Sequence, residues 1–168
     1  MVSLSLFLPI FATLATLFLG GFVLFNNIKN KINKVFSMFA LWAAFWVFSV
    51  MMADFSKSLE SALFWTRMSI VGPAIFSPLL VYFSYIFPSE REKIGFQKII
   101  LLFFPVFIFL IFAPTELNVK EISFEEWGTD FTPGILYYLL IAYIFFYFSL
   151  AFVNFLKSYR FFSGKNSF

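Results

Sequence analysis

The amino-acid sequence predicts an all-α fold, a polytopic transmembrane bundle of about five membrane-spanning helices. Hydrophobic residues make up 61% of the 168 residues and charged residues 12%, about half the charged fraction of an ordinary soluble domain. The apolar residues gather in five long runs, and the charged residues lie mainly between the runs. Because about 20 apolar residues span a bilayer, residues 1–168 are expected to form one transmembrane domain of a multi-pass cell-membrane protein.

The third apolar run, with a predicted helix over residues 61–87, is the segment around which the other four are arranged. It contains one full charge, Arg67, and a Gly72-Pro73 pair. A proline inside a helix removes a backbone donor and favours a kink. Such prolines are either bending points between two packings of the bundle or ordinary kinks that improve packing. The candidate bends are Pro73, Pro78 and, in the fourth run, Pro105.

The remaining helices are predicted over residues 4–25, 35–53, 99–113 and 133–156. The first run has 22 residues without a charge and no Lys or Arg before Lys29, so it is typical of a transmembrane helix rather than of a cleaved signal peptide. The fourth run is short for a span. We expect it to include Phe96 or Pro114 at its ends, or to thin the bilayer locally.

The loops between the runs alternate in charge. Nine Lys and Arg residues lie in residues 26–34, 89–98 and the tail after residue 156, whereas two lie in residues 54–60 and 115–130. Basic loops stay on the cytoplasmic side of a membrane. The sequence therefore predicts the N-terminus outside and the C-terminus in the cytoplasm, and this bias argues against a dual-topology transporter.

The longest loop, residues 115–130, is acidic, with five acidic residues and one lysine. The segment Glu125-Glu126-Trp127 could offer oxygen atoms to a hard cation or a cationic ligand, but the spacing of an EF-hand is missing. We expect a solvated external loop and no metal site.

Two residue types are absent, and their absence excludes several classes of function. The chain has no Cys and no His, so it lacks thiolate nucleophiles and the commonest metal and haem ligands. Lys, Asp and Glu fall outside or at the edges of the apolar runs, which disfavours a retinal Schiff base and a proton relay. We predict no enzymatic activity, no cofactor and, because the basic residues serve topology, no nucleic-acid partner.

Arg67 is the most informative candidate for a functional site. It lies about two turns, or ~10 Å, along the helix from Glu60. Its side chain either snorkels to water and lipid phosphate, or pairs with Asp54 or Glu60 or with a ligand held near Trp65 and Trp46. Two tryptophans at i and i+4 on the second helix favour packing or interface anchoring over a ligand cage. The candidate ligand or coupling residues are Arg67, Trp65, Trp46, Trp42, Asp54 and Glu60.

The order of features over residues 26–89 carries a family resemblance. A first helix ends in a basic Asn/Lys loop, and Asn33-Lys34-Val35-Phe36 opens a second helix with two tryptophans. The third helix passes through the sequence ALFWTRM to Gly72 and closes with YFSYIFP. This order resembles the seven-helix N-terminal sensor region of bacterial and archaeal membrane histidine kinases, and the rest of the chain resembles it in topology.

The resemblance implies a membrane-embedded input module of a signalling receptor, in a two-component system. In that family, the region usually precedes a cytoplasmic kinase, PAS or cyclase-type output domain. For this chain we therefore expect a ligand or the state of the membrane to shift the helix packing, and the shift to reach an output domain on the cytoplasmic side. The sequence departs from the family in having five predicted helices and no phospho-acceptor histidine. We therefore expect the chain to be one of three things: a region incomplete at its C-terminus, a truncated paralogue, or a protein that acts together with other chains. Each of the three is compatible with an oligomer.

Two other classes of protein compete with this interpretation. A small membrane transporter or channel subunit needs polar groups along a path, and apart from Arg67 the spans offer mainly Ser, Thr and Tyr hydroxyls. A membrane enzyme ranks last because the acidic residues 125–130 lack a base or metal-binding partner. Flux assays in liposomes distinguish the transporter from the sensor.

Overall fold

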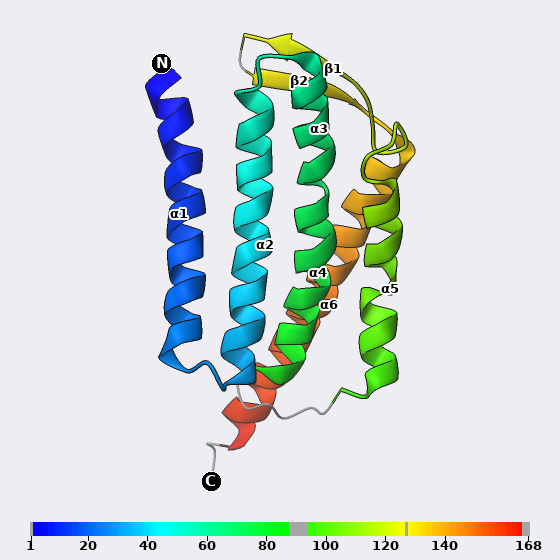
Figure 1. Ribbon diagram of the computed structural model, residues 1–168. Coiled ribbons are helices and arrows are strands. Elements are labelled where there is room, and N and C mark those ends of the chain that lie inside the picture. The colour runs from blue at the N-terminus through cyan, green and yellow to red at the C-terminus, as the bar shows by residue number, and fades with distance from the viewer. Residues whose placement is uncertain (1, 88–93, 127, 166–168) are drawn as a thin grey trace.

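The computed structural model describes residues 2–87, 94–126 and 128–165. These residues form a bundle of long helices with a small β-hairpin at one end (Figure 1). The elements in chain order are α1 (Val2–Asn26), α2 (Lys31–Asp54), α3 (Leu59–Ser69), α4 (Val71–Ile86), α5 (Phe96–Phe112), β1 (Val119–Glu125), β2 (Gly128–Pro133) and α6 (Ile135–Lys165).

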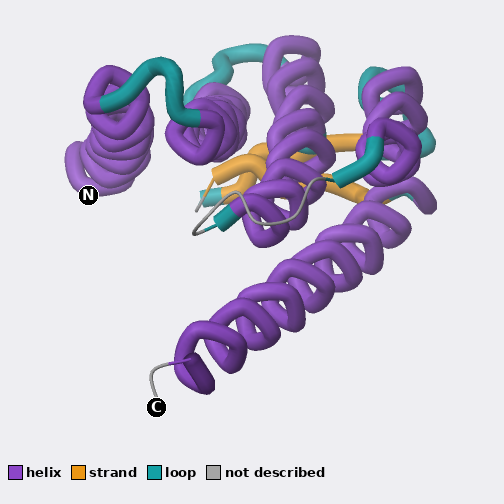
Figure 2. Tube along the Cα trace, turned by 90° about the horizontal axis from the view of Figure 1, so that it is seen from below, coloured by secondary structure: helices purple, strands orange, loops and turns teal. Residues whose placement is uncertain are grey.

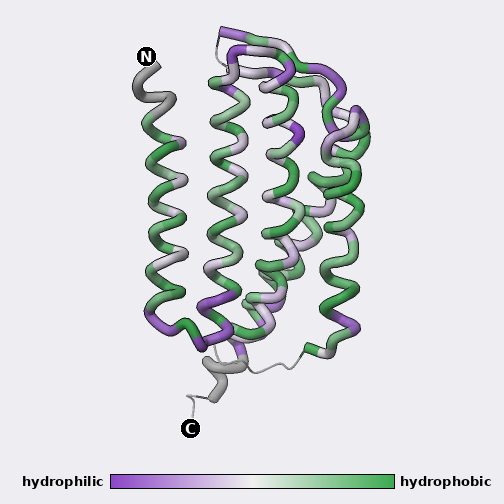
Figure 3. Tube along the Cα trace, viewed as in Figure 1, coloured by the Kyte–Doolittle hydropathy of each residue, from purple (hydrophilic) through white to green (hydrophobic). Residues whose placement is uncertain are grey.

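The predicted all-α polytopic bundle is confirmed. Within the described residues, four helical segments are long and apolar enough to cross a membrane, and α5 is a shorter apolar helix of 17 residues. Hydrophobic residues run along the middle of the helices, and hydrophilic residues gather at both ends of the bundle (Figure 3). At about 1.5 Å per residue α5 is ~26 Å long, slightly less than the ~30 Å core of a typical bilayer.

The third run forms two helices where the sequence predicted one. Helices α3 and α4 are separated by Ile70 alone, which keeps right-handed helical angles of φ −69° and ψ −25°. The interruption has a direct cause, because Pro73 has no N–H to donate to the carbonyl of Ser69, four residues earlier. Since Ile70 remains helical, the two helices continue as one segment of 28 residues that is long and apolar enough to span a membrane.

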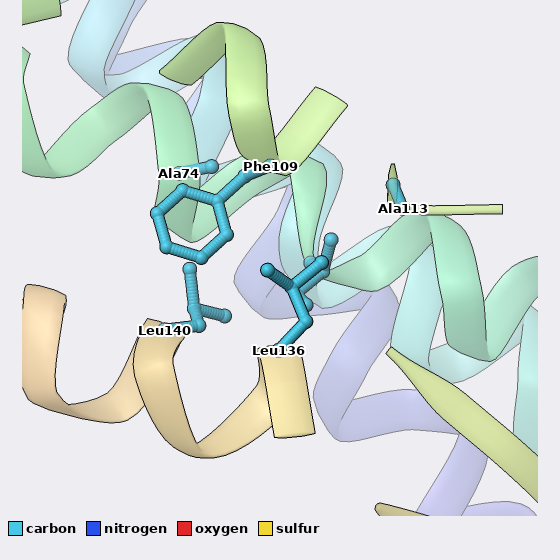
Figure 4. Close-up of a cluster of buried hydrophobic side chains, with 6 residues drawn as sticks. Ala74, Phe109, Ala113, Leu136 and Leu140 are labelled. Atoms are coloured by element: carbon cyan, nitrogen blue, oxygen red, sulfur yellow. The ribbon is translucent and has the colours of Figure 1, made fainter. Parts of the chain in front are cut away.

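Helix α4 is the centre of the bundle, as the sequence predicted for the third run. In the span that contains it, 61% of the most apolar stretch is buried inside the protein, against 11–22% in the other three spans. Figure 2 shows α1, α2, α4 and α5 in a row, with α6 crossing one face of the row. One core cluster joins α4, α5 and α6: Phe109 points between Ala74 on one side and Leu136 and Leu140 on the other (Figure 4).

Helix α1 packs along α2 at the edge of the row. The two backbones approach closely at Gly20, where an added Cβ would stand 2.9 Å from the Cβ of Ala40. Beside this contact the Ser37 hydroxyl donates to the Gly20 carbonyl at 2.8 Å. Small residues and hydroxyl-to-carbonyl bonds of this kind hold helices together where lipid removes the hydrophobic drive for association.

The acidic loop predicted for residues 115–130 is in part a β-hairpin, which corrects that prediction. Strands β1 and β2 pair antiparallel, with Ile122 opposite Phe131 and Glu125 opposite Gly128.

Two helix boundaries differ from those predicted from the sequence. Helix α2 begins at Lys31 rather than residue 35, because Asn30 caps it by accepting the N–H groups of Ile32 and Asn33. Helix α6 runs to Lys165 rather than residue 156.

The ends of the elements alternate between the two ends of the bundle. The start of α1 and the hairpin lie at one end, and the α1–α2 connection, the start of α5 and the end of α6 lie at the other (Figure 1). The second end carries Lys29, Lys31, Lys34 and Lys98. Residues 88–93, which belong to the predicted basic loop 89–98, lie outside the described residues. Which end faces the cytoplasm stays a prediction from loop charge.

Reporter fusions test this orientation. Fusions after Lys34, Lys98 and Lys165 are expected to report the cytoplasm, and fusions after Lys57 and Lys120 the outside, because basic loops resist translocation. Activity of a paired periplasmic and cytoplasmic reporter at each site measures the side. The fusions after Lys98 and Lys165 are expected to report the same side. If they reported opposite sides, α5 would not cross the membrane.

Candidate functional site

The candidate site lies at the hairpin end of the bundle, where α2, α3, α5 and α6 all begin or end. We call it the polar cap and define it by the hairpin, the α5–β1 connection over residues 113–118, and the side chains of Asp54, Arg67 and Asn118. Two of these, Asp54 and Arg67, are candidates from the sequence. Each holds a different part of the hairpin to the bundle.

Arg67 reaches from α3 to the base of the hairpin. Its Nε and Nη2 donate to the carbonyl oxygen of Val119 at 3.2 and 2.9 Å, and its Nη1 donates to that of Pro114 at 2.8 Å. The planar guanidinium suits this geometry, because it presents a fixed fork of donors that one ammonium cannot reproduce. Three of its five N–H groups are used, which leaves two for water, lipid or a ligand.

The observed partners of Arg67 differ from the two carboxylates that the sequence offered. The structure brings the guanidinium to backbone carbonyls and to neither carboxylate, Asp54 or Glu60. Glu60 instead lies exposed in the first turn of α3, where a negative charge faces the positive end of the helix dipole. The charge of Arg67 is therefore balanced by carbonyl dipoles rather than by an ion pair.

Asn118 forms the buried floor of the polar cap, with 1% of its surface exposed. Its Nδ2 donates to the carbonyls of Ala113 at 2.9 Å and Arg67 at 3.3 Å, so that it joins the end of α5 to α3. The backbone carbonyl of Asn118 accepts the N–H of Gly134, and the backbone carbonyl of Leu117 accepts the N–H of Leu136 in the first turn of α6. The connection 113–118 thus contacts three helices at once.

Asp54 holds the turn of the hairpin at the end of α2. Its Oδ1 accepts the backbone N–H of Thr129 at 3.1 Å, and the Thr129 hydroxyl donates to the carbonyl of Ala53 at 3.0 Å. Gly128, the residue before Thr129, has φ +142°, a conformation that side-chain-bearing residues rarely adopt. An added Cβ at this position would also stand 3.1 Å from Oδ1 of Asp54.

The three candidate tryptophans line the seam between α2 and the α3–α4 span. The ring of Trp46 lies 5.9 Å from that of Phe76, and the ring of Trp65 lies 5.6 Å from that of Phe48. The seam is tight at Gly72, because a Cβ there would stand 2.7 Å from the Cβ of Trp46 and 2.9 Å from the carbonyl oxygen of Trp42.

The candidate bends lie in α4 and α5. Pro73 and Pro78 are buried residues of α4, and Pro105 lies inside α5. Each removes one helical donor, so each leaves one carbonyl four residues earlier without its usual partner.

Sequence reasoning missed the hairpin, Asn118 and Gly134. The signal for the hairpin was a pair of short segments with β-branched and aromatic residues on either side of Trp127-Gly128. Gly134 carried no such signal, although an added Cβ there would collide with the carbonyl oxygen of Leu117. Close approach of a loop backbone makes that glycine necessary.

The fold and the polar cap define a class of protein, a polytopic bundle of apolar helices whose one end is closed by a small hydrogen-bonded cap. The family model described as the N-terminal 7TM region of histidine kinase matches residues 8–167. The chain belongs to this family, which confirms the resemblance seen in residues 26–89 and extends it over nearly the whole sequence. No curated protein and no solved structure matches the chain.

Two glycine variants test the close packing of the polar cap. Gly134→Ala is expected to lower stability by about 1–3 kcal/mol, because the new methyl group meets backbone rather than a movable side chain. Gly95→Ala is the matched control, since its φ is −62° and no atom lies within 4 Å of its added Cβ. Thermal unfolding in a fixed detergent measures both. Equal midpoints for the two variants would show that the α5–β1 connection does not press on Gly134.

Proposed function

We propose that this chain is the input module of a signalling receptor, in which the polar cap and the bundle respond to a stimulus and α6 carries the response to a cytoplasmic output domain. Membership of the histidine-kinase N-terminal family supports the sensor role, and that region is a non-catalytic input module. The observation that carries the finer proposal is the direct joining of the hairpin to α6 through Gly134 alone.

Helix α6 suits the transmission of a signal along the bundle. It has 31 residues, about 46 Å at 1.5 Å per residue, and it starts at the polar cap and ends at the opposite, basic end. Its first turn is bonded to the connection 113–118, which Arg67 and Asn118 hold against α3. A shift of the hairpin therefore acts on the start of α6 through hydrogen bonds rather than through a flexible linker.

The response requires two packings of the bundle that differ by a few kcal/mol, so that a stimulus can change their populations. The hairpin is suited to bias such a pair of states. An isolated two-stranded hairpin is marginally stable in water, and this one depends on attachments to α2 and α3 for its position. A ligand or membrane change that loosens one attachment alters the restraint on α6.

Arg67 variants in a full-length histidine kinase that contains this region test the proposal. Arg67→Leu removes all three hydrogen bonds to the α5–β1 connection and the hairpin. Arg67→Lys cannot reproduce the pair of hydrogen bonds from Nε and Nη2 to the carbonyl of Val119. Both are expected to change stimulus-dependent autophosphorylation at least severalfold at normal membrane abundance. Lys57→Leu, which removes an exposed cation at the same end of the bundle, is the control and is expected to behave as wild type.

The opposite result is wild-type signalling in Arg67→Leu at normal abundance. It would leave Arg67 as a snorkelling interface anchor and remove the polar cap from the signalling path.

A pair of Asp54 variants tests the second attachment. Asp54→Asn keeps an oxygen that can accept the Thr129 N–H, so output is expected to stay near wild type. Asp54→Leu removes the acceptor and is expected to alter output in the same direction as Arg67→Leu. The same autophosphorylation assay measures both. Wild-type output in Asp54→Leu would mean that the acceptor at residue 54 is dispensable, and an equal change in both variants would mean that the charge of Asp54 matters rather than its acceptor oxygen.

A further inference from the structure

One face of α6 carries a row of polar side chains deep in the bundle. Tyr143, Tyr147 and Asn154 follow one another at spacings of four and seven residues, which places them on the same side of the helix. Each is bonded to a neighbouring helix: Tyr143 Oη donates to the Ala74 carbonyl at 3.0 Å, Tyr147 Oη to the Leu102 carbonyl at 2.8 Å, and Asn154 Nδ2 to Ser84 Oγ at 3.1 Å. The row therefore connects α6 to both α4 and α5.

The acceptor of Tyr143 is available because of a proline. In a regular helix the carbonyl of Ala74 would accept the N–H of residue 78, but residue 78 is proline and has no N–H. Ala74 is fully buried, so water does not replace the missing donor. An unsatisfied carbonyl within a membrane is strongly unfavourable, and a side chain from a neighbouring helix commonly supplies the bond.

The second tyrosine contacts α5 one turn along α6. The Tyr147 hydroxyl donates to the carbonyl of Leu102. Pro105 leaves the neighbouring carbonyl, that of Leu101, without a helical donor, whereas the helical donor of Leu102 is the N–H of Val106. Tyr143 alone therefore bonds a carbonyl that a proline leaves without its donor, and Tyr147 adds a bond to α5 beside such a carbonyl.

We propose that Tyr143 is a positioning residue that fixes the height of α6 against α4, by bonding the carbonyl that Pro78 leaves without a donor. Sliding α6 by one turn would strand the Ala74 carbonyl in an apolar interior. The inference assigns a second purpose to Pro78, which supplies an acceptor rather than only a bend, and it does not rest on the proposed signalling function.

A double-mutant cycle tests the pairing of Tyr143 with Pro78. Tyr143→Phe removes the hydroxyl and retains the ring, which packs 4.9 Å from Phe109. Pro78→Ala restores an N–H that can serve Ala74. In the wild-type background Tyr143→Phe is expected to lower the unfolding midpoint of the chain in a fixed detergent by about 2–4 °C, and in the Pro78→Ala background by less than about 1 °C.

The matched control is Tyr138→Phe, because Tyr138 is on the same helix but 57% exposed, and neither background is expected to respond to it. Pro78→Ser restores the same N–H and replaces Pro78→Ala if the latter does not fold. An equal midpoint shift for Tyr143→Phe in both backgrounds, or no shift in either, overturns the inference.

A second measurement needs no proline variant. The chain has no cysteine, so spin labels at Leu59→Cys on α3 and Tyr159→Cys on α6, both exposed positions, report the relative height of the two helices without interference. The distance distribution is expected to be broader in Tyr143→Phe than in the form with Tyr143. Identical distributions would mean that the hydroxyl does not set the height of α6.

Discussion

The hydrogen bonds from Arg67 to the carbonyls of Val119 and Pro114 hold together parts of the chain that are about 50 residues apart. A charged arginine at the centre of a membrane helix costs about 2.5–3.5 kcal/mol and less near the end of the span. A hydrogen bond to a charged group contributes about 1.5–3 kcal/mol when its loss is measured, and Arg67 makes three. The hydrogen bonds therefore offset the free-energy cost of placing the arginine where it reaches the hairpin. Through these bonds the hairpin, the α5–β1 connection and the start of α6 form one unit.

The middle of the bundle obeys a different constraint, because lipid-buried backbone must find its hydrogen bonds within the protein. Hydroxyls of α4 bond to carbonyls of their own helix, as Ser77 does to Pro73 at 2.7 Å. Where a proline removes a donor from α4, a tyrosine of α6 takes its place. Glycine serves the same bundle by allowing close approach, as at Gly72 against α2. The apolar helices are therefore joined by a few specific polar contacts.

The helices could be predicted from the sequence because apolar runs of membrane length have few other structures available. The hairpin has a weaker signal, the β-branched and aromatic residues on either side of Trp127-Gly128. Its strands lack clean alternation, since Val119 is 1% exposed and Phe124 is 46% exposed, and the acidic composition favoured a solvated loop. Arg67 was identified as unusual, and the partners expected for it were Asp54, Glu60, a ligand or, by snorkelling, water and lipid phosphate. Backbone carbonyls have no side-chain signature, so a sequence alone cannot indicate that Pro114 and Val119 would receive the guanidinium.

Hydrogen exchange at the hairpin tests most directly whether Arg67 holds the polar cap on the bundle. The paired amides of β1 and β2 between Ile122 and Phe131 are followed in wild type and in Arg67→Leu, with the amides around Val81 in the centre of α4 as the internal reference. If the account is correct, the hairpin amides exchange about tenfold faster or more in Arg67→Leu, while the reference is unchanged. Equal protection of the hairpin in both forms would contradict it.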